Sequence, residues 1–96
     1  MSLNRVNPRR DQSEAEIVEY LEKRGAVVEY LSGQSIPDLL VGYAGRWLLV
    51  ECKTGRAALS PGQTAWHQAA TAKGLPVYVV RTADEVAKII DRVARL

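Results

Sequence analysis

The chain has 96 residues, of which 47% are hydrophobic and 25% are charged. This composition is typical of one small globular domain and excludes a disordered or fibrous chain. Thirteen Lys and Arg residues against 11 Asp and Glu residues give a formal net charge of +2, so nucleic acid is an allowed partner that charge alone does not favour. The lone Cys52 excludes a disulfide framework, and the lone His67 argues against a zinc site.

Two further absences bear on where the protein works. No apolar stretch approaches the roughly 20 residues of a membrane span, and the N-terminal residues 1–10 are too polar for a signal peptide. We therefore expect an intracellular, cytoplasmic protein without a membrane partner. A chain this short buries only about 60–65% of its unfolded surface, so a partner subunit would add stability.

One helix is predicted near the N-terminus, after an arm at residues 1–8 that we expect to be flexible. Apolar residues at helical spacing, followed by a glycine, predict a helix over 10–24; they are Ile17, Val18, Leu21 and Gly25. The helix can begin at Asn7-Pro8 or at Ser13, because Ser13 and Glu16 form a capping-box pattern.

The rest of the chain predicts a sheet with two more helices. Strands are expected at 26–31, 38–43, 46–53 and 77–80, with a tight hairpin turn at 44–45. Ser60-Pro61 with Gln63 predicts the start of a helix that ends near residue 73, and Thr82 caps a last helix. The helix between the last two strands makes a right-handed crossover, so those strands are parallel. The sequence predicts one α/β domain over 1–96, with a four-stranded mixed sheet flanked by helices and a C-terminal helix.

Charged residues within the apolar strands are the strongest functional signal. Asp38 opens one apolar strand, and Glu51 and Lys53 end the most apolar strand of the chain. Glu51 and Lys53 share a face because side chains two apart on a strand point the same way. Pairing outward from the hairpin turn brings residue 38 close to them. We therefore expect three charged groups at one end of the sheet.

The first helix can supply a fourth charged group. At about 100° per residue, Glu14 lies at the centre of the apolar stripe, where an acid is costly unless something neutralises it. Glu16 is the alternative, although capping of the helix explains it better. A divalent cation shared with the strand carboxylates would neutralise Glu14.

These residue types suit phosphodiester hydrolysis. Carboxylate oxygens of Glu14, Asp38 and Glu51 suit Mg²⁺, and the backbone carbonyl of Cys52 could be a further ligand. A bound metal activates water and offsets charge at the phosphate. Lys53 could orient the attacking water or stabilise the charged transition state.

Two sets of residues resemble a known family. Pro37-Asp38 followed by Glu51-Cys52-Lys53, in an αβββαβ order, resembles the PD-(D/E)XK nuclease superfamily with its restriction-endonuclease-like core. The segments LSPGQTAWH at 59–67 and GLPVYVVR at 74–81 are similar to the VRR-NUC family of virus-type replication-repair nucleases. The resemblance covers about residues 13–85.

This resemblance implies a DNA endonuclease of DNA repair that depends on Mg²⁺ or Mn²⁺. Its metal ligands fall on Asp38, Glu51, Glu14 and the Cys52 backbone carbonyl, and its other catalytic residues fall on Lys53 and Gln63. Stand-alone members resemble archaeal Holliday-junction resolvases, which are homodimers that cut four-way junctions. Branched DNA and a second copy are therefore the expected partners, and a virus-encoded origin would fit the small stand-alone form. Ser35 stands where we expect glycine, two residues before the proline, so the loop before Asp38 can differ.

Several of these residues also have structural explanations. The capping box alone accounts for Gln63, core or interface packing for Trp66, and a surface or packing position for His67. Arg56 follows Lys53 in a loop where it could grip the phosphate backbone, and Arg9 and Arg10 are weaker candidates.

Two other functions remain open. The chain could cut unbranched DNA or RNA, which nothing in the sequence excludes. It could also be a DNA-binding subunit that keeps the fold without catalysis, although Lys53 beside two acids argues against this.

Overall fold

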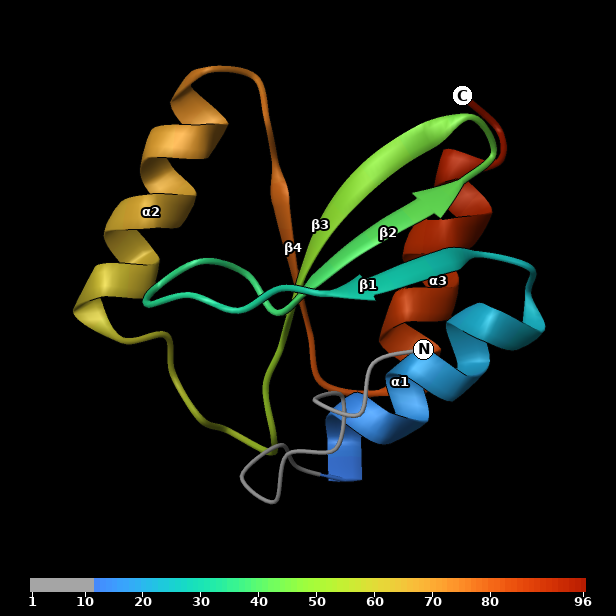
Figure 1. The fold of residues 1–96 in the computed structure, drawn as a ribbon, viewed down its shortest axis with the longest axis horizontal. Coiled ribbons are helices and arrows are strands. Elements are labelled where there is room, and N and C mark those ends of the chain that lie inside the picture. The colour runs from blue at the N-terminus through green and yellow to red at the C-terminus, as the bar shows by residue number, and fades with distance from the viewer. Residues whose placement is uncertain (1–11) are drawn as a thin grey trace.

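The computed structural model describes residues 12–96, and its elements follow the predicted order (Figure 1). The helices are α1 (Gln12–Lys23), α2 (Pro61–Ala72) and α3 (Ala83–Val93), and the strands are β1 (Val27–Tyr30), β2 (Leu39–Tyr43), β3 (Arg46–Cys52) and β4 (Val77–Val80). The arm expected at 1–8 and the helix start at Asn7-Pro8 lie outside the described residues. Within residues 12–96, no helix is long and apolar enough to cross a membrane.

The four strands form one mixed sheet in the order β1-β2-β3-β4. β1, β2 and β3 pair antiparallel, whereas β3 and β4 pair parallel across the α2 crossover. This confirms the predicted α/β class and the mixed four-stranded sheet. The β2–β3 register pairs Leu39 with Val50, so the residue before β2 lies opposite the residue after Val50. The hairpin therefore places Asp38 across from Glu51.

The hydrophobic core lies on one face of the sheet, beneath α1 and α3. It combines one stripe of each helix with alternate strand residues: Ile17, Val18, Leu21, Val28, Leu39, Val41, Leu48, Val50, Cys52, Val80, Val86, Ile90 and Val93. The opposite face carries α2, which contributes none of these residues. The one fully buried side chain of α2 is that of His67, while Trp66 and Ala70 are half-buried, so no fully buried apolar side chain attaches this helix.

Ser13 has a different role from the predicted helix cap. It lies inside the first turn of α1, which begins at Gln12. Its Oγ donates hydrogen bonds to the carbonyl oxygens of Lys53 at 3.2 Å and Arg81 at 2.7 Å. The prediction of a Ser13 cap was wrong because contacts with the ends of two strands take up the hydroxyl. Ser13 thereby ties α1 to β3 and β4.

The loop before Asp38 explains why glycine is expected at position 35. Ser35 has a φ of +72°, in the left-handed region where glycine carries no steric cost. The same loop packs against the start of α2, where a side chain at Gly62 would collide with Ser35 Oγ. The chain thus departs from the expected residue type, while its backbone adopts a conformation that glycine favours.

Candidate active site

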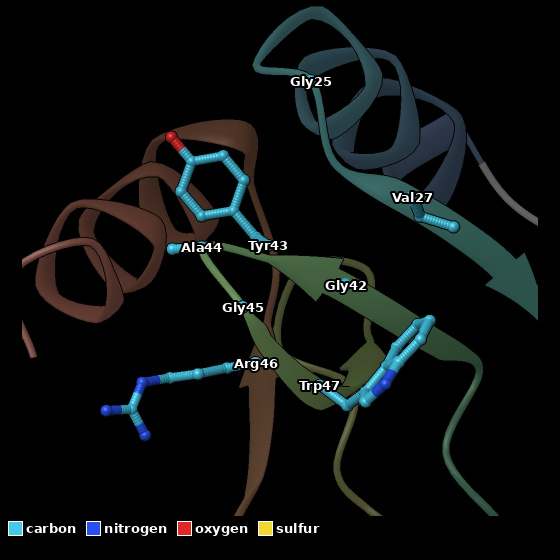
Figure 2. Close-up of a pocket in the computed structure, with 8 residues that line it drawn as sticks. All are labelled: Gly25, Val27, Gly42, Tyr43, Ala44, Gly45, Arg46 and Trp47. Carbon is cyan, nitrogen blue, oxygen red and sulfur yellow. The ribbon is translucent and has the colours of Figure 1, made fainter.

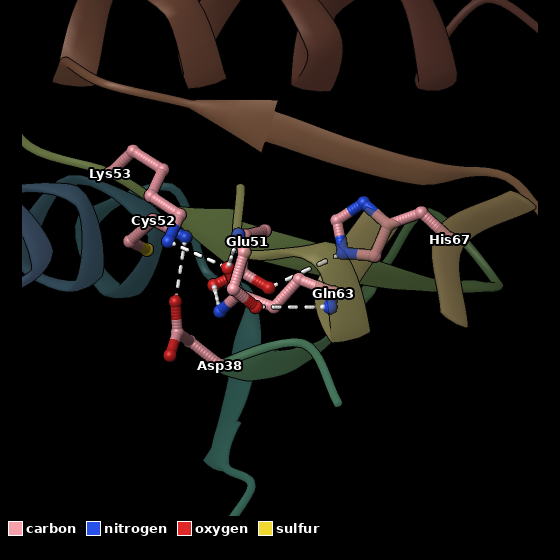
Figure 3. Close-up of polar contacts among 7 residues, drawn as sticks. Asp38, Glu51, Cys52, Lys53, Gln63 and His67 are labelled. Atoms are coloured by element: carbon pink, nitrogen blue, oxygen red, sulfur yellow. Dashed lines mark hydrogen bonds and ion pairs between the residues drawn. The ribbon is translucent and has the colours of Figure 1, made fainter. Parts of the chain in front are cut away.

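The predicted charged residues meet at the end of the sheet where β2 begins and β3 ends (Figure 3). Asp38 precedes β2, while Glu51 and Cys52 are the last residues of β3. The backbone N–H of Cys52 donates to Asp38 Oδ2 at 2.8 Å, which fixes the Asp38 carboxylate against the strand. Lys53 follows directly, and its N–H donates to the Val80 carbonyl at 2.9 Å.

Glu14 joins this end of the sheet from α1. Its side chain is 5% exposed, whereas Glu16 is exposed, so Glu14 is the acid of this helix that faces the site. Carboxylate oxygens of Glu14 and Asp38 and the Cys52 Sγ lie within 4.8 Å of one another. The sequence analysis expects the backbone carbonyl of Cys52 as a metal ligand. The structure places the Cys52 Sγ in this group as a further possible donor atom. The carbonyl stays a prediction.

Glu51 is the most deeply buried carboxyl of the site, at 1% exposed. It lies outside the 4.8 Å group and reaches it through a side-chain hydrogen bond with Asp38. Burial, the hydrogen bond and charge of Asp38, and the charge of Glu14 together raise the pKa of Glu51 to about 8, against the opposing charge of Lys53.

Crowded carboxyls of this kind fit a divalent cation. Glu14 and Asp38 offer hard oxygen donors within 4.8 Å of each other, and Glu51 interacts with Asp38 beside them. A cation would offset the burial and the negative charge that raise the pKa of Glu51. The donor set therefore matches the oxygen-rich site that Mg²⁺ or Mn²⁺ prefers.

Gln63 has both the structural and the site contacts that the sequence suggested as alternatives. The capping box is present: Ser60 Oγ accepts from the Gln63 N–H at 3.1 Å, and Gln63 Oε1 accepts from the Ser60 N–H at 2.9 Å. The same Oε1 accepts from Lys53 Nζ at 2.8 Å, and Gln63 Nε2 donates to Glu51 Oε2 at 3.4 Å. One side chain therefore starts α2 and holds two site residues (Figure 3).

His67 is a site contact that the sequence analysis missed. Its side chain is buried, and its Nε2 lies 3.3 Å from Glu51 Oε1. Burial lowers the pKa of His67 and the Lys53 charge lowers it further, so the imidazole is neutral at neutral pH. The available signal was its spacing: His67 follows Gln63 by four residues, which puts both on one face of a helix.

The loop after Lys53 carries the predicted DNA contact. Arg56 is exposed there, between two residues whose carbonyls accept hydrogen bonds from Arg81 Nη1, Gly55 at 2.9 Å and Ala57 at 2.8 Å. Arg81 thus anchors this loop. Arg9 and Arg10 lie outside the described residues.

Comparison with known proteins gives one informative similarity. Neither a protein-family model nor a curated protein matches the chain. A solved structure described as "VRR_NUC domain" is 29% identical and superposes with a TM-score of 0.70. The match covers 84% of this chain and 97% of that one, so the two share nearly the whole domain.

In the metal-free chain, the raised pKa of Glu51 predicts that the free energy of unfolding falls as the pH rises. The folded chain keeps the Glu51 proton up to a pKa of about 8, whereas the unfolded chain releases it near the ordinary glutamate pKa of 4.5. Between these values the folded state binds more protons and is destabilised by rising pH. Urea unfolding in EDTA across this window measures the loss. Saturating Mg²⁺ or Mn²⁺ should diminish it, because the cation replaces the proton.

Two variants control this prediction. Glu51→Gln keeps a neutral side chain at every pH and should remove this part of the pH dependence. Glu19→Gln changes an exposed carboxyl of α1 and should leave it in place. If the stability of Glu51→Gln fell with pH as steeply as that of the wild-type chain, the assignment of the effect to Glu51 would be wrong.

Proposed function

We propose that this chain, which is similar to a solved VRR_NUC domain over 84% of its length, is a metal-dependent DNA endonuclease that hydrolyses phosphodiester bonds. We further propose that it selects branched DNA, such as four-way junctions, and acts as a homodimer. The observation that carries the proposal is the convergence of Asp38, Glu51 and Lys53 at one sheet end, with Glu14 beside them. A DNA substrate is also consistent with the intracellular, cytoplasmic location expected from the sequence.

The carboxyl groups are assigned to the cation. Glu14, Asp38 and Glu51 would hold it, with the Cys52 carbonyl as a further ligand. When bound, the cation supplies charge neutralisation at the phosphate and a water of lowered pKa. The hydrogen bond from the Cys52 N–H keeps Asp38 oriented toward this position before any cation arrives.

Lys53 and Gln63 act on the phosphate side of the site. Lys53 Nζ is a positive donor that can stabilise the charge that develops on the phosphate oxygens during attack. Gln63 Oε1 accepts from this ammonium at 2.8 Å and limits its positions. A binding module without catalysis gains little from a lysine held in this way, which favours the enzyme over the non-catalytic subunit.

Arg56 is assigned to the DNA backbone. It is exposed on a loop that Arg81 holds through two carbonyls. A guanidinium at this place can pair with a phosphate without reading the bases. Arg9 and Arg10 would add to this contact. Contacts of this kind recognise the shape of the DNA backbone rather than its base sequence.

The homodimer is supported by apolar side chains exposed at the other end of the sheet. Val27 and Trp47 flank Gly42 in the strand register, and they are 54% and 64% exposed. The Trp47 ring covers Gly42 and borders a hollow of about 340 Å³ near the β2–β3 turn (Figure 2). An exposed tryptophan is a common anchor of interfaces, and a two-fold pair of sites suits paired cuts across a junction.

The nuclease activity is tested with end-labelled four-way junction, flap, linear duplex, single strand and RNA, each with Mg²⁺, Mn²⁺ or EDTA. We expect paired, metal-dependent cuts in the junction. Lys53→Ala should lower the rate of cleavage by about 100-fold or more. Asp38→Asn should abolish cleavage because it weakens binding of the cation. Lys88→Ala, which removes an exposed lysine of α3, should cut normally.

The alternatives give different outcomes in the same assay. Equal cutting of linear duplex or RNA would replace junction selectivity with a broader nuclease activity. Binding of DNA without cutting under either metal would sink the enzymatic proposal and leave a DNA-binding subunit.

Sedimentation velocity tests the homodimer separately. The wild-type chain should sediment as a dimer at micromolar concentration. Trp47→Glu should yield monomers, because it places a charge in the apolar contact. Leu96→Glu, which changes another exposed apolar residue, should remain dimeric. A wild-type monomer would remove the basis for paired junction cuts.

A further inference from the structure

The attachment of α2 to the sheet is mostly polar. The described part of the helix buries one side chain, His67, and that side chain is not apolar. Gln63 and His67 lie one turn apart and both reach Glu51 on β3. A helix without a buried apolar stripe gains little from packing, so these contacts serve the position of Glu51 as much as that of the helix.

We propose that His67 is a positioning residue that fixes the Glu51 carboxylate for cation binding. The inference rests on the proposed function, in which Glu51 holds the cation. His67 Nε2 lies 3.3 Å from Glu51 Oε1; in the proposed tautomer it carries the proton and donates to that oxygen, while Gln63 Nε2 donates to Oε2. With one donor on each oxygen, the carboxylate cannot rotate freely about its last bond.

The geometry leaves Glu51 available to the cation. Each carboxylate oxygen can accept more than one bond, so the two α2 donors do not exhaust Glu51. Its carboxyl also contacts Asp38, which belongs to the 4.8 Å group with Glu14 and Cys52. The donors therefore approach from α2, while the cation group lies toward Asp38. Groups that hold a metal ligand in this way strengthen metal binding without touching the metal.

His67 itself has no place among the ligands. Its Nε2 is engaged with Glu51, and it is absent from the 4.8 Å group of the described residues. Its burial, at 8% exposed, also keeps it from DNA. Its effect must therefore pass through Glu51.

Binding of Mn²⁺ to the full chain without DNA tests the proposal, with free Mn²⁺ measured by electron paramagnetic resonance. His67→Leu fills the space without a donor and should weaken Mn²⁺ binding by about 10-fold or more. His67→Gln restores an N–H donor and should recover most of the affinity. Gln68→Ala, at an exposed position of the same helix, should bind as the wild-type chain does.

Two results of this titration would overturn the proposal. One is His67→Leu binding Mn²⁺ as tightly as the wild-type chain. The other is His67→Gln and His67→Leu losing the same affinity, since shape rather than the donor would then matter. Metal binding is measured apart from cutting. A wild-type chain that binds Mn²⁺ and cuts no nucleic acid would refute the proposed function. The Mn²⁺ affinities of the His67 variants would still test the positioning role of His67.

A second measurement avoids variants that fail to fold. His67 is the only histidine of the chain, so in untagged protein the imidazole nitrogen resonances belong to one residue. Addition of diamagnetic Mg²⁺ should leave Nε2 protonated and shift its proton resonance in a saturable way, as the carboxylate 3.3 Å away binds the metal. Imidazole resonances that do not change while Mg²⁺ saturates its site, or a proton on Nδ1 alone in that state, would contradict the donor role.

Discussion

Repulsion among acids that have little access to water is the constraint on which this structure depends. Glu14 and Glu51 are almost fully buried, and both act electrostatically on the same end of the sheet as Asp38. A buried carboxylate is costly unless it is paired, protonated or bound to a cation. In the metal-free chain, Glu51 meets this cost by holding a proton. A divalent cation meets it better, because it neutralises several acids at once.

A hairpin turn and side-chain hydrogen bonds bring these groups together. A two-residue turn at Ala44 and Gly45 sets the β2–β3 register, which places Asp38 across from Glu51. α2 then adds polar contacts: Gln63 bonds Lys53 and Glu51, and His67 contacts Glu51. The position of α2 and the geometry of the site therefore depend on each other, so a substitution in one should alter the other.

What could be predicted from sequence follows from the range of each interaction. Strand alternation, the hairpin turn and helical periodicity are local, and they placed Asp38, Glu51 and Glu14 at one sheet end. The roles of Ser13, Arg81 and His67 were missed, because each depends on partners 16 to 68 residues away in the chain. The Ser35 departure likewise needed the backbone, since only its φ shows that the loop keeps a glycine-like conformation.

Anomalous diffraction from crystals grown with Mn²⁺ tests the central claim most directly, because it locates the cation without any assay of activity. The account predicts one or more manganese peaks at the sheet end, within bonding distance of Asp38 and Glu51 and beside Glu14. Two results would contradict this prediction: manganese peaks only at other places, or no peak at this end of the sheet at saturating Mn²⁺. Cation binding would then not account for the burial of these acids.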